Sequence, residues 1–252
     1  MYRDQSGALN ESLSDVFGSL VKQRSLGHTA QQAGWIIGAG LFTPNVNGQG
    51  IRSMSAPGTA YDDPVLGKDP QPGHMSDFKN VDYDNGGVHI NSGIPNHAFY
   101  IVANEIGGHA WEKAGNIWYV ALRDRLRAKS DFQDAANMTY AVARQLFGAG
   151  SIEQQAVLKG WSEAGINVVE EREDDGGGSP PRRGGGCLLA VPALLLGAVA
   201  LQGALKLTQK AIGECHANLL RAHGRLRRNA RNRDGGHRFA AAGRCPRAWR
   251  VG

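Results

Sequence analysis

The stretch SGALNESLSDVFGSLVKQ, residues 6–23, predicts an amphipathic helix. Its apolar side chains recur at spacings of three and four, which places them on one stripe of a helix. These side chains are Leu9, Leu13, Val16, Phe17 and Leu20. Glu11 and Asp15 stand four residues apart, so they lie on one face, one turn from each other. By spacing alone, such a pair of carboxylates is most simply a solvated helix face.

The sequence beyond this helix predicts a mainly α-helical lobe. Residues 25–96 are rich in Gly, Pro, Asn and Asp and show little periodicity, which indicates a long irregular loop region. Further helices are predicted at residues 96–106, 112–127 and 131–147. Ser151, with Gln154 three residues later, has the pattern of a capping box for a last helix that ends near Gly165. We therefore predict one helical lobe over residues 1–168.

The composition changes beyond this lobe. Residues 169–186 predict a charged and then glycine-rich linker. Residues 187–252 begin with an apolar run, 187–205, and continue as a basic tail. Three interpretations of the tail are open: the product of a shifted reading frame, because its residues have GC-rich codons, a disordered basic extension, or a membrane anchor through the apolar run. The anchor is weakened by Pro192, Gly197 and Gly203.

Charge and cysteines are concentrated in the same tail. The net charge is +5, but residues 1–169 hold 13 Lys and Arg against 16 Asp and Glu, so the predicted lobe is slightly acidic. A nucleic-acid partner is therefore not expected for the lobe. The cysteines are Cys187, Cys215 and Cys245, so the lobe is expected to use neither disulfides nor thiolate ligands. The first four residues do not have the pattern of a secretory signal.

A second informative stretch is DNGGVHINSG, residues 84–93. Gly86 and Gly87 would let the backbone approach a ligand closely. Asp84 could accept a hydrogen bond from the imidazole of His89 and favour its cationic form. Taken alone, His89 could equally be a satisfied loop histidine, and Arg52 could be the partner of a loop salt bridge.

These motifs together resemble the thermolysin-type neutral metalloproteases. The resemblance runs from Tyr2 to about Ile166 and includes GALNESLSD (residues 7–15), DNGGVHINSG and SGIPN (residues 92–96). It implies the C-terminal helical lobe of a thermolysin-like catalytic unit. The implied activity is that of a zinc-dependent metalloendopeptidase, which hydrolyses peptide bonds of peptide or protein substrates with a metal-activated water.

The resemblance also implies metal-binding roles for the two carboxylates of the first helix. Glu11 would be the third zinc ligand, which leaves a fourth position for water. Asp15 would lie in the second shell, where it fixes the tautomer of an imidazole ligand.

Five further residues receive roles from the resemblance. His89, oriented by Asp84, would donate to the oxyanion of the tetrahedral intermediate, and Tyr2 would contact the same oxyanion. Arg52 would hydrogen-bond the substrate carbonyl on the leaving-group side, a task that suits a guanidinium fork. Asn10, beside Glu11, would be a structural or substrate contact.

The chain departs from the family in one important respect. The family signature H-E-x-x-H supplies two zinc-binding histidines and the general base. The histidines here are at positions 28, 74, 89, 97, 109, 216, 223 and 237, and no two are four apart. The helix that carries the signature would precede Met1. We therefore expect a truncated lobe that neither retains zinc nor hydrolyses peptides alone and that would need a complementing N-terminal lobe.

Two further expectations follow from the same comparison. Without a partner lobe, the apolar face of the first helix is expected to be exposed. Calcium sites are not expected, because Lys22 and Gln49 stand where calcium-binding relatives have acidic ligands, and Asp62-Asp63-Pro64 has the pattern of a turn. The alternative function is a non-catalytic pseudoenzyme module that binds peptides or a partner.

Overall fold

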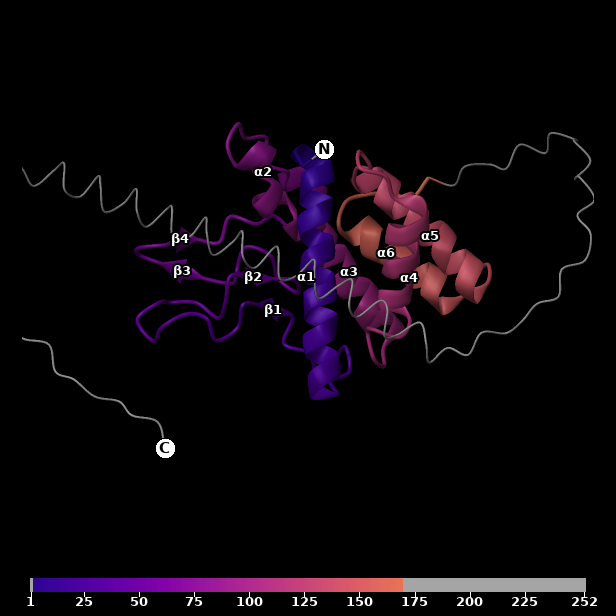
Figure 1. The fold of residues 1–252 in the computed structure, drawn as a ribbon, viewed down its shortest axis with the longest axis horizontal. Helices are drawn as coiled ribbons and strands as arrows, with labels where there is room; N and C mark the ends of the chain where they lie inside the picture. The colour runs from indigo at the N-terminus through magenta and orange to yellow at the C-terminus, as the bar shows by residue number, and fades with distance from the viewer. Residues whose placement is uncertain (1, 170–252) are drawn as a thin grey trace, which may run out of the picture. The chain divides into compact units, whose positions relative to one another are not determined.

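The computed structural model describes residues 2–169, which form a helical lobe with a loop region beside it. Its helical elements are α1 (Asp4–Leu26), η1 (Met75–Asp77), α2 (Asp84–Asn91), α3 (Gly93–Ile106), α4 (Ala114–Val120), the π-helical η2 (Ala121–Arg125), α5 (Phe132–Phe147) and α6 (Ile152–Glu163). In Figure 1, α1 runs through the middle of this lobe, with α2 on one side and α4, α5 and α6 on the other. The prediction of a mainly α-helical lobe is confirmed.

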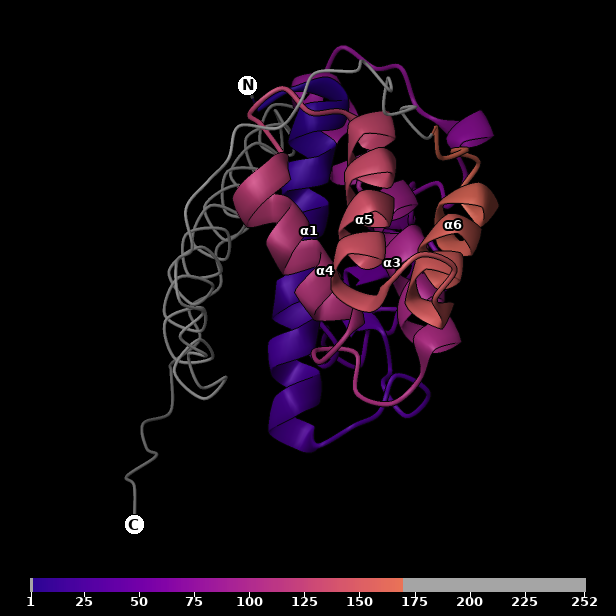
Figure 2. The ribbon, with the colours of Figure 1, turned by 90° about the vertical axis from the view of Figure 1, so that its right-hand side faces the viewer.

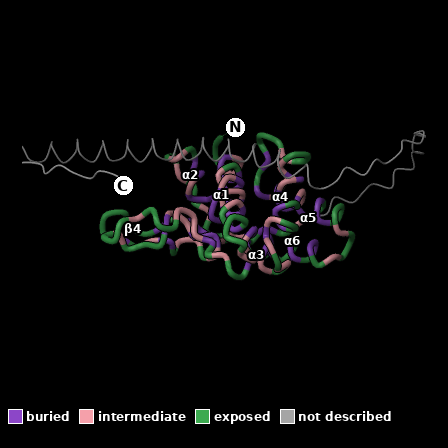
Figure 3. Tube along the Cα trace, turned by 60° about the horizontal axis from the view of Figure 1, so that its bottom comes forward, coloured by how far each residue is buried: buried purple, intermediate pink, exposed green. Residues whose placement is uncertain are grey.

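The loop region contains two small antiparallel pairs of strands. These are β1 (Ile36–Ile37) with β2 (Arg52–Ser53), and β3 (Asp62–Asp63) with β4 (Gly67–Lys68). Ile37 pairs with Arg52, so the first strand pair fixes the backbone of a predicted site residue. The tube around β4 is largely coloured as exposed in Figure 3. A segment with so few packed elements needs other contacts to hold its side chains in place.

The predicted irregular segment 25–96 is shorter than expected. α2 and the first residues of α3 lie inside it. Gly86, Gly87 and Pro95 are ordinarily helix breakers, but here the glycines complete a left-handed turn at the start of α2. Pro95 lies in the first turn of α3, where its missing N–H interrupts no intrahelical hydrogen bond.

The helix predicted at residues 112–127 is interrupted. It begins as α4 and changes at Ala121 to π-helical geometry, in which the Leu126 N–H donates to the Ala121 carbonyl at 2.9 Å. The helix predicted at 131–147 is confirmed as α5, preceded by Asp131 as its N-cap.

Both later helices begin with side-chain caps. Asp131 and Asp134 form a reciprocal capping box at the start of α5. At α6, the Ser151 side chain accepts from the Gln154 N–H at 3.2 Å, as predicted. The return bond differs from the prediction: Gln154 Oε1 accepts from the Gly150 N–H at 2.7 Å instead of the Ser151 N–H. The cap is therefore built over one additional residue.

The apolar stripe of α1 is buried within the lobe. Leu9, Leu13, Val16 and Leu20 are all buried, while Phe17 is partly buried against the same core. α1 contacts α3, α4 and α5, and Figure 2 shows α4 and α5 beside it. The expectation that this face would be exposed was therefore wrong, because the neighbouring helices of the lobe cover it.

Aromatic side chains hold α3, α4 and α6 together. Trp118 stacks on Trp161 with 6.2 Å between ring centroids, and Phe99 meets Trp118 edge-on at 5.0 Å. The buried Trp161 indole N–H donates to the Thr139 hydroxyl of α5 at 2.9 Å. This bond satisfies the one polar atom of the indole inside the core.

Several predictions concern residues outside the described range. The linker beyond residue 169, the tail at 187–252 and its cysteines stay predictions. No helix within residues 2–169 combines the length and hydropathy needed to cross a bilayer.

Replacing Asp131 with Ala is expected to lower the free energy of unfolding by about 1 kcal/mol, because the N-cap acceptor of α5 is lost. Urea denaturation measures the change. Lys129→Ala, an exposed change two residues earlier, is the matched control and should stay within about 0.5 kcal/mol of the parent chain. Equal unfolding midpoints for Asp131→Ala and the control would contradict the cap assignment.

Candidate active site

The site begins with a close contact between α1 and α2. Gly7 of α1 faces Val88 of α2, and a Cβ at position 7 would lie 2.5 Å from Val88 Cγ1. Such an approach is open only to glycine, because a stiff β-branched side chain cannot move aside at low cost. Glu11 is one turn further along α1 and His89 follows Val88, so this contact brings the two predicted site residues together.

A left-handed turn then aims Asp84 at His89. Four consecutive residues have positive φ: Asp84 at 54°, Asn85 at 51°, Gly86 at 84° and Gly87 at 78°. For a residue other than glycine, this conformation costs about 1–2 kcal/mol. The turn folds the Asp84 carboxylate back over the chain, where Oδ2 accepts from the His89 backbone N–H at 2.9 Å and Oδ1 accepts from His89 Nδ1 at 2.5 Å.

His89 is therefore held as a hydrogen-bond donor. The hydrogen bond to Asp84 raises the pKa of His89, and partial burial opposes this rise. The charges of Glu11 and Asp84 raise the pKa further, whereas the charge of Arg52 lowers it. The other ring nitrogen, Nε2, lies 3.5 Å from Glu11 Oε2 and 3.4 Å from the Tyr2 hydroxyl. A protonated His89 thus points its second N–H towards the Glu11 side of the site.

Tyr2, from the segment before α1, contacts both Glu11 and His89. Its hydroxyl donates a short hydrogen bond to Glu11 Oε1. The structure therefore brings together four predicted residues, Tyr2, Glu11, Asp84 and His89. Glu11 is a suitable zinc ligand by its chemistry. However, residues 2–169 contain no group of three or more His, Cys, Asp or Glu side chains that could hold a metal. The described residues by themselves do not fit a zinc ion.

Asp15 and Arg52 form a second ion pair, and Asp15 lies one helical turn after Glu11 on α1. Arg52 donates from Nε to Asp15 Oδ2 and from Nη2 to Oδ1, each at 2.7 Å. Asn96 Nδ2 also donates to Asp15 Oδ2, at 2.9 Å. The partners found for Asp15 within residues 2–169 are thus a guanidinium and an amide, not an imidazole. The Asp15 and Arg52 side chains retain only 6% and 15% of their exposure, so the pair is well shielded from solvent.

Two residues behind the site were missed by the sequence analysis. Asn96 is one, although it ends the quoted SGIPN motif. Gln71 is the other: its Nε2 donates to the His89 carbonyl at 2.8 Å and to Ser92 Oγ at 3.0 Å. Gln71 belongs to the irregular loop region, where no periodicity marks a buried position. Its role becomes visible only once the loop is folded against α2.

Asn10 is not part of this group. It is exposed and makes none of the hydrogen bonds described above, but it lines a cavity of about 320 Å³ together with Leu13, Leu126 and one member of the group, Tyr2. The site therefore contains six of the seven predicted residues in two neighbouring clusters.

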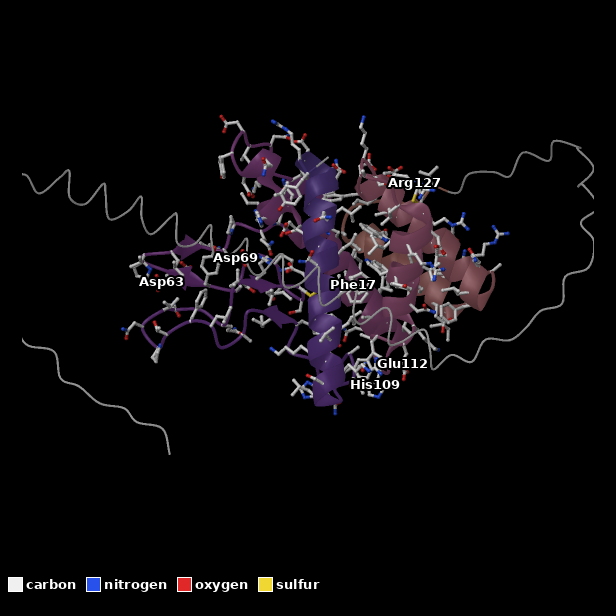
Figure 4. All side chains as sticks on the ribbon, viewed as in Figure 1. Phe17, Asp63, Asp69, His109, Glu112 and Arg127 are labelled. Atoms are coloured by element: carbon white, nitrogen blue, oxygen red, sulfur yellow. The ribbon has the colours of Figure 1, made fainter. Side chains whose placement is uncertain are left out.

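The Asp63 carboxylate stabilises the turn between β3 and β4. Asp63 accepts backbone hydrogen bonds from Asn47, Leu66 and Val65, and these bonds lower its pKa. Asp63 is the second residue of β3, and Figure 4 shows it away from α1. The turn predicted at Asp62-Asp63-Pro64 is therefore only partly right: Asp62 and Asp63 form β3, and the turn itself covers residues 64–66.

The comparisons with known proteins identify the family. A family model described as thermolysin metallopeptidase, alpha-helical domain, matches residues 1–166. The chain belongs to this family of metallopeptidases, as the sequence motifs predicted.

Individual relatives agree with this assignment. The extracellular metalloprotease of Pectobacterium carotovorum subsp. carotovorum is 54% identical over 174 residues, 68% of this chain and 49% of that protein. Protease PrtS of Photorhabdus sp. (strain Az29) is 53% identical over 174 residues, 68% of this chain and 46% of that protein. The precursor of protealysin, a metalloproteinase from Serratia proteamaculans, superposes with a TM-score of 0.64 at 57% identity, covering 66% of this chain and 51% of its own. The chain thus spans about half the length of these relatives.

Gly7→Ala is expected to destabilise the fold by about 1–3 kcal/mol, because the new methyl group overlaps Val88. Gly18→Ala is the matched control on the same helix, where a Cβ would meet no described heavy atom within 4 Å. The control should stabilise the chain by roughly 0.5–1 kcal/mol. Thermal and urea unfolding measure both changes. Similar effects of the two substitutions would contradict the close-contact assignment.

The pKa of His89 is expected to be above its ordinary value and to fall in Asp84→Asn, because the charge-assisted hydrogen bond is removed. NMR titration of the imidazole measures it, with the exposed Asp77→Asn as control. Since the folded-state pKa is the higher one, the stabilisation linked to His89 is complete below its unfolded pKa, about 6.5, and is lost as pH rises through the folded pKa. Unfolding titrations that show the same pH slope in Asp84→Asn would refute this linkage.

Proposed function

We propose that this chain supplies the helical half of the active site of a zinc-dependent metalloendopeptidase. The observation that carries the proposal is the convergence of Tyr2, Glu11 and His89 at the junction of α1 and α2. The relatives named above are metalloproteases. We propose that the complete catalytic unit, of which this chain would be one part, hydrolyses peptide or protein substrates.

Glu11 is proposed as one ligand of the zinc ion. A single carboxylate does not retain Zn²⁺ against water and chelators, so the remaining protein ligands must come from outside residues 2–169. A complementing lobe with an H-E-x-x-H helix is the proposed source. Zinc in this family of sites supplies Lewis acidity and a nucleophilic water. Asp15 would then support the site in two indirect ways. It forms the ion pair with Arg52, and its remaining lone pairs could accept a hydrogen bond from an imidazole ligand of the zinc.

His89 and Tyr2 are proposed as donors to the oxyanion. The raised pKa of His89 keeps the imidazole protonated to higher pH, and Asp84 fixes its orientation through two hydrogen bonds. A preoriented donor of this kind typically lowers the barrier by roughly 3–4 kcal/mol. The Tyr2 hydroxyl, 3.4 Å from His89 Nε2, lies where it could donate to the same oxygen.

Arg52 is proposed to bind the substrate carbonyl on the leaving-group side. Its guanidinium is held in one plane by the two bonds to Asp15, so it needs little reordering when a carbonyl arrives. Asn10 remains a proposed contact only, on a different face of α1 from this guanidinium.

The alternative proposal is a non-catalytic module that binds peptides or a protein partner. The absence of a three-ligand metal group within residues 2–169 favours this alternative for the chain on its own. The same donors, Arg52 and His89, could bind peptide carbonyls without hydrolysing them. Zinc content and hydrolysis, measured separately, distinguish the two proposals.

The purified chain alone is expected to carry no stoichiometric zinc after dialysis and to leave casein intact. Mixing it with the part of the Pectobacterium carotovorum protease that it does not cover should restore both zinc binding and hydrolysis. In this mixture, Glu11→Gln should abolish zinc retention, and His89→Ala should lower kcat by about 10²–10³-fold. Glu105→Gln is the control, because Glu105 is an exposed residue that forms an ion pair with Lys159.

Two results would count against the metalloendopeptidase proposal. One is stoichiometric zinc on the isolated chain that survives Glu11→Gln, because the ligands would then be different residues. The other is a folded mixture that binds casein peptides with no hydrolysis, which would favour the non-catalytic module.

A further inference from the structure

Asn96 occupies an unusual position beside the Asp15–Arg52 ion pair. It is fully buried in α3 and donates from Nδ2 to Asp15 Oδ2 at 2.9 Å. The same Asp15 oxygen accepts from Arg52 Nε, so one carboxylate joins residues of α1, β2 and α3. Asn96 is therefore in direct contact with Asp15 but not with the oxyanion donors.

The other end of the Asn96 amide is unsatisfied. Its Oδ1 is buried and has no hydrogen-bond partner among the described residues. Turning the amide over would place this oxygen against Asp15 Oδ2, so the hydrogen-bond network fixes Nδ2 as the atom that faces Asp15. A buried oxygen without a donor costs free energy. The amide is thus retained at a position where its second polar atom is destabilising.

Packing alone does not explain an asparagine here. Leucine has a side chain with the same branching and the same number of heavy atoms, and it would leave no unpaired oxygen. What leucine lacks is an N–H for Asp15. With Asn96 present, the Asp15 carboxylate is held from the side of α3, and its two oxygens can face the Arg52 fork.

Arg52 is the residue of this ion pair that comes from the loop region. It lies on β2, a two-residue strand in the mostly exposed loop region, and its backbone is paired only with Ile37 of β1 in the ladder. The bidentate bond to Asp15 connects its guanidinium to α1. A residue that holds the Asp15 carboxylate in place therefore also acts on the orientation of Arg52.

We propose that Asn96 is a positioning residue: by clamping the Asp15 carboxylate from α3, it presents the Arg52 guanidinium to the substrate carbonyl. The role of Arg52 towards substrate rests on the function proposed above. The clamping itself is a property of this chain and is measured without a protease assay.

The test compares Asn96→Leu with Gln23→Leu in the full chain. Gln23 is a matched control, because it too is a buried amide with an unpartnered oxygen, and its Nε2 donates to Ser19 of the same helix. Phenylglyoxal, which modifies arginine guanidinium groups, is the probe, and mass spectrometry gives the rate at each arginine. Asn96→Leu should raise the Arg52 rate at least threefold, with Arg24 unchanged, and Gln23→Leu should leave Arg52 unchanged.

Stability separates positioning from a general structural role. Because Asn96→Leu also removes an unpaired buried oxygen, its unfolding equilibrium constant should change less than tenfold. In an Asp15→Ala background, Asn96→Leu should produce no further rise in the Arg52 rate. An unchanged Arg52 rate in folded Asn96→Leu overturns the proposal, and so does an equal rise at all arginines. Asn96→Ser, which cannot reach Asp15, serves the same test if the leucine variant does not fold.

The complemented protease mixture tests the link to substrate. Asn96→Leu should lower kcat/KM at least tenfold while zinc content stays unchanged. If the mixture with the parent chain hydrolyses casein and Asn96→Leu does so equally well, the positioning role is wrong although the proposed function stands. If the parent mixture is inactive, the proposed function fails, and the Arg52 rates still decide whether Asn96 clamps the ion pair.

Discussion

The packing of α1 on α2 at Gly7 and Val88 sets the geometry on which the site depends. Glu11 belongs to one helix and His89 to the other, and the approach of the two backbones determines how far apart their side chains are. The hydrogen bond from Tyr2 to Glu11 and the contact of Tyr2 with His89 follow from the same distance. A methyl group at position 7 would act on all of these together, because they share one helix–helix contact.

The second constraint is the shielded carboxylate of Asp15. A charge that is removed from water must be paired and hydrogen-bonded, and Asp15 obtains three donors from two residues, Arg52 and Asn96. These donors come from β2 and α3, so the ion pair fastens an otherwise sparse loop region to the helical core. The network leaves one oxygen, Asn96 Oδ1, buried without a hydrogen-bond partner among the described residues.

The lobe combines a buried core with a single proposed zinc ligand among its described residues. Its helices cover the apolar stripe of α1, and Trp118 and Trp161 pack inside, so the lobe has a buried hydrophobic core among residues 2–169. Glu11, by contrast, offers one carboxylate where a stable zinc site needs three or four ligands. The chain covers 49% and 46% of the lengths of the two curated protease relatives named above.

The sequence by itself determined the family, the mainly helical fold and the helices with strong periodicity, such as α1 and α5, because apolar spacing and caps are local properties. It also placed Asp84 beside His89, which are close along the chain. Only the tertiary structure decided that Asp15 pairs with Arg52, that Gln71 and Asn96 support the site, and that Gly86 and Gly87 start a helix in place of ending one. The contacts of Asp15, Gln71 and Asn96 join residues far apart in the chain, which no local pattern specifies. The glycines favour a left-handed turn locally, but only the fold shows that a helix follows it.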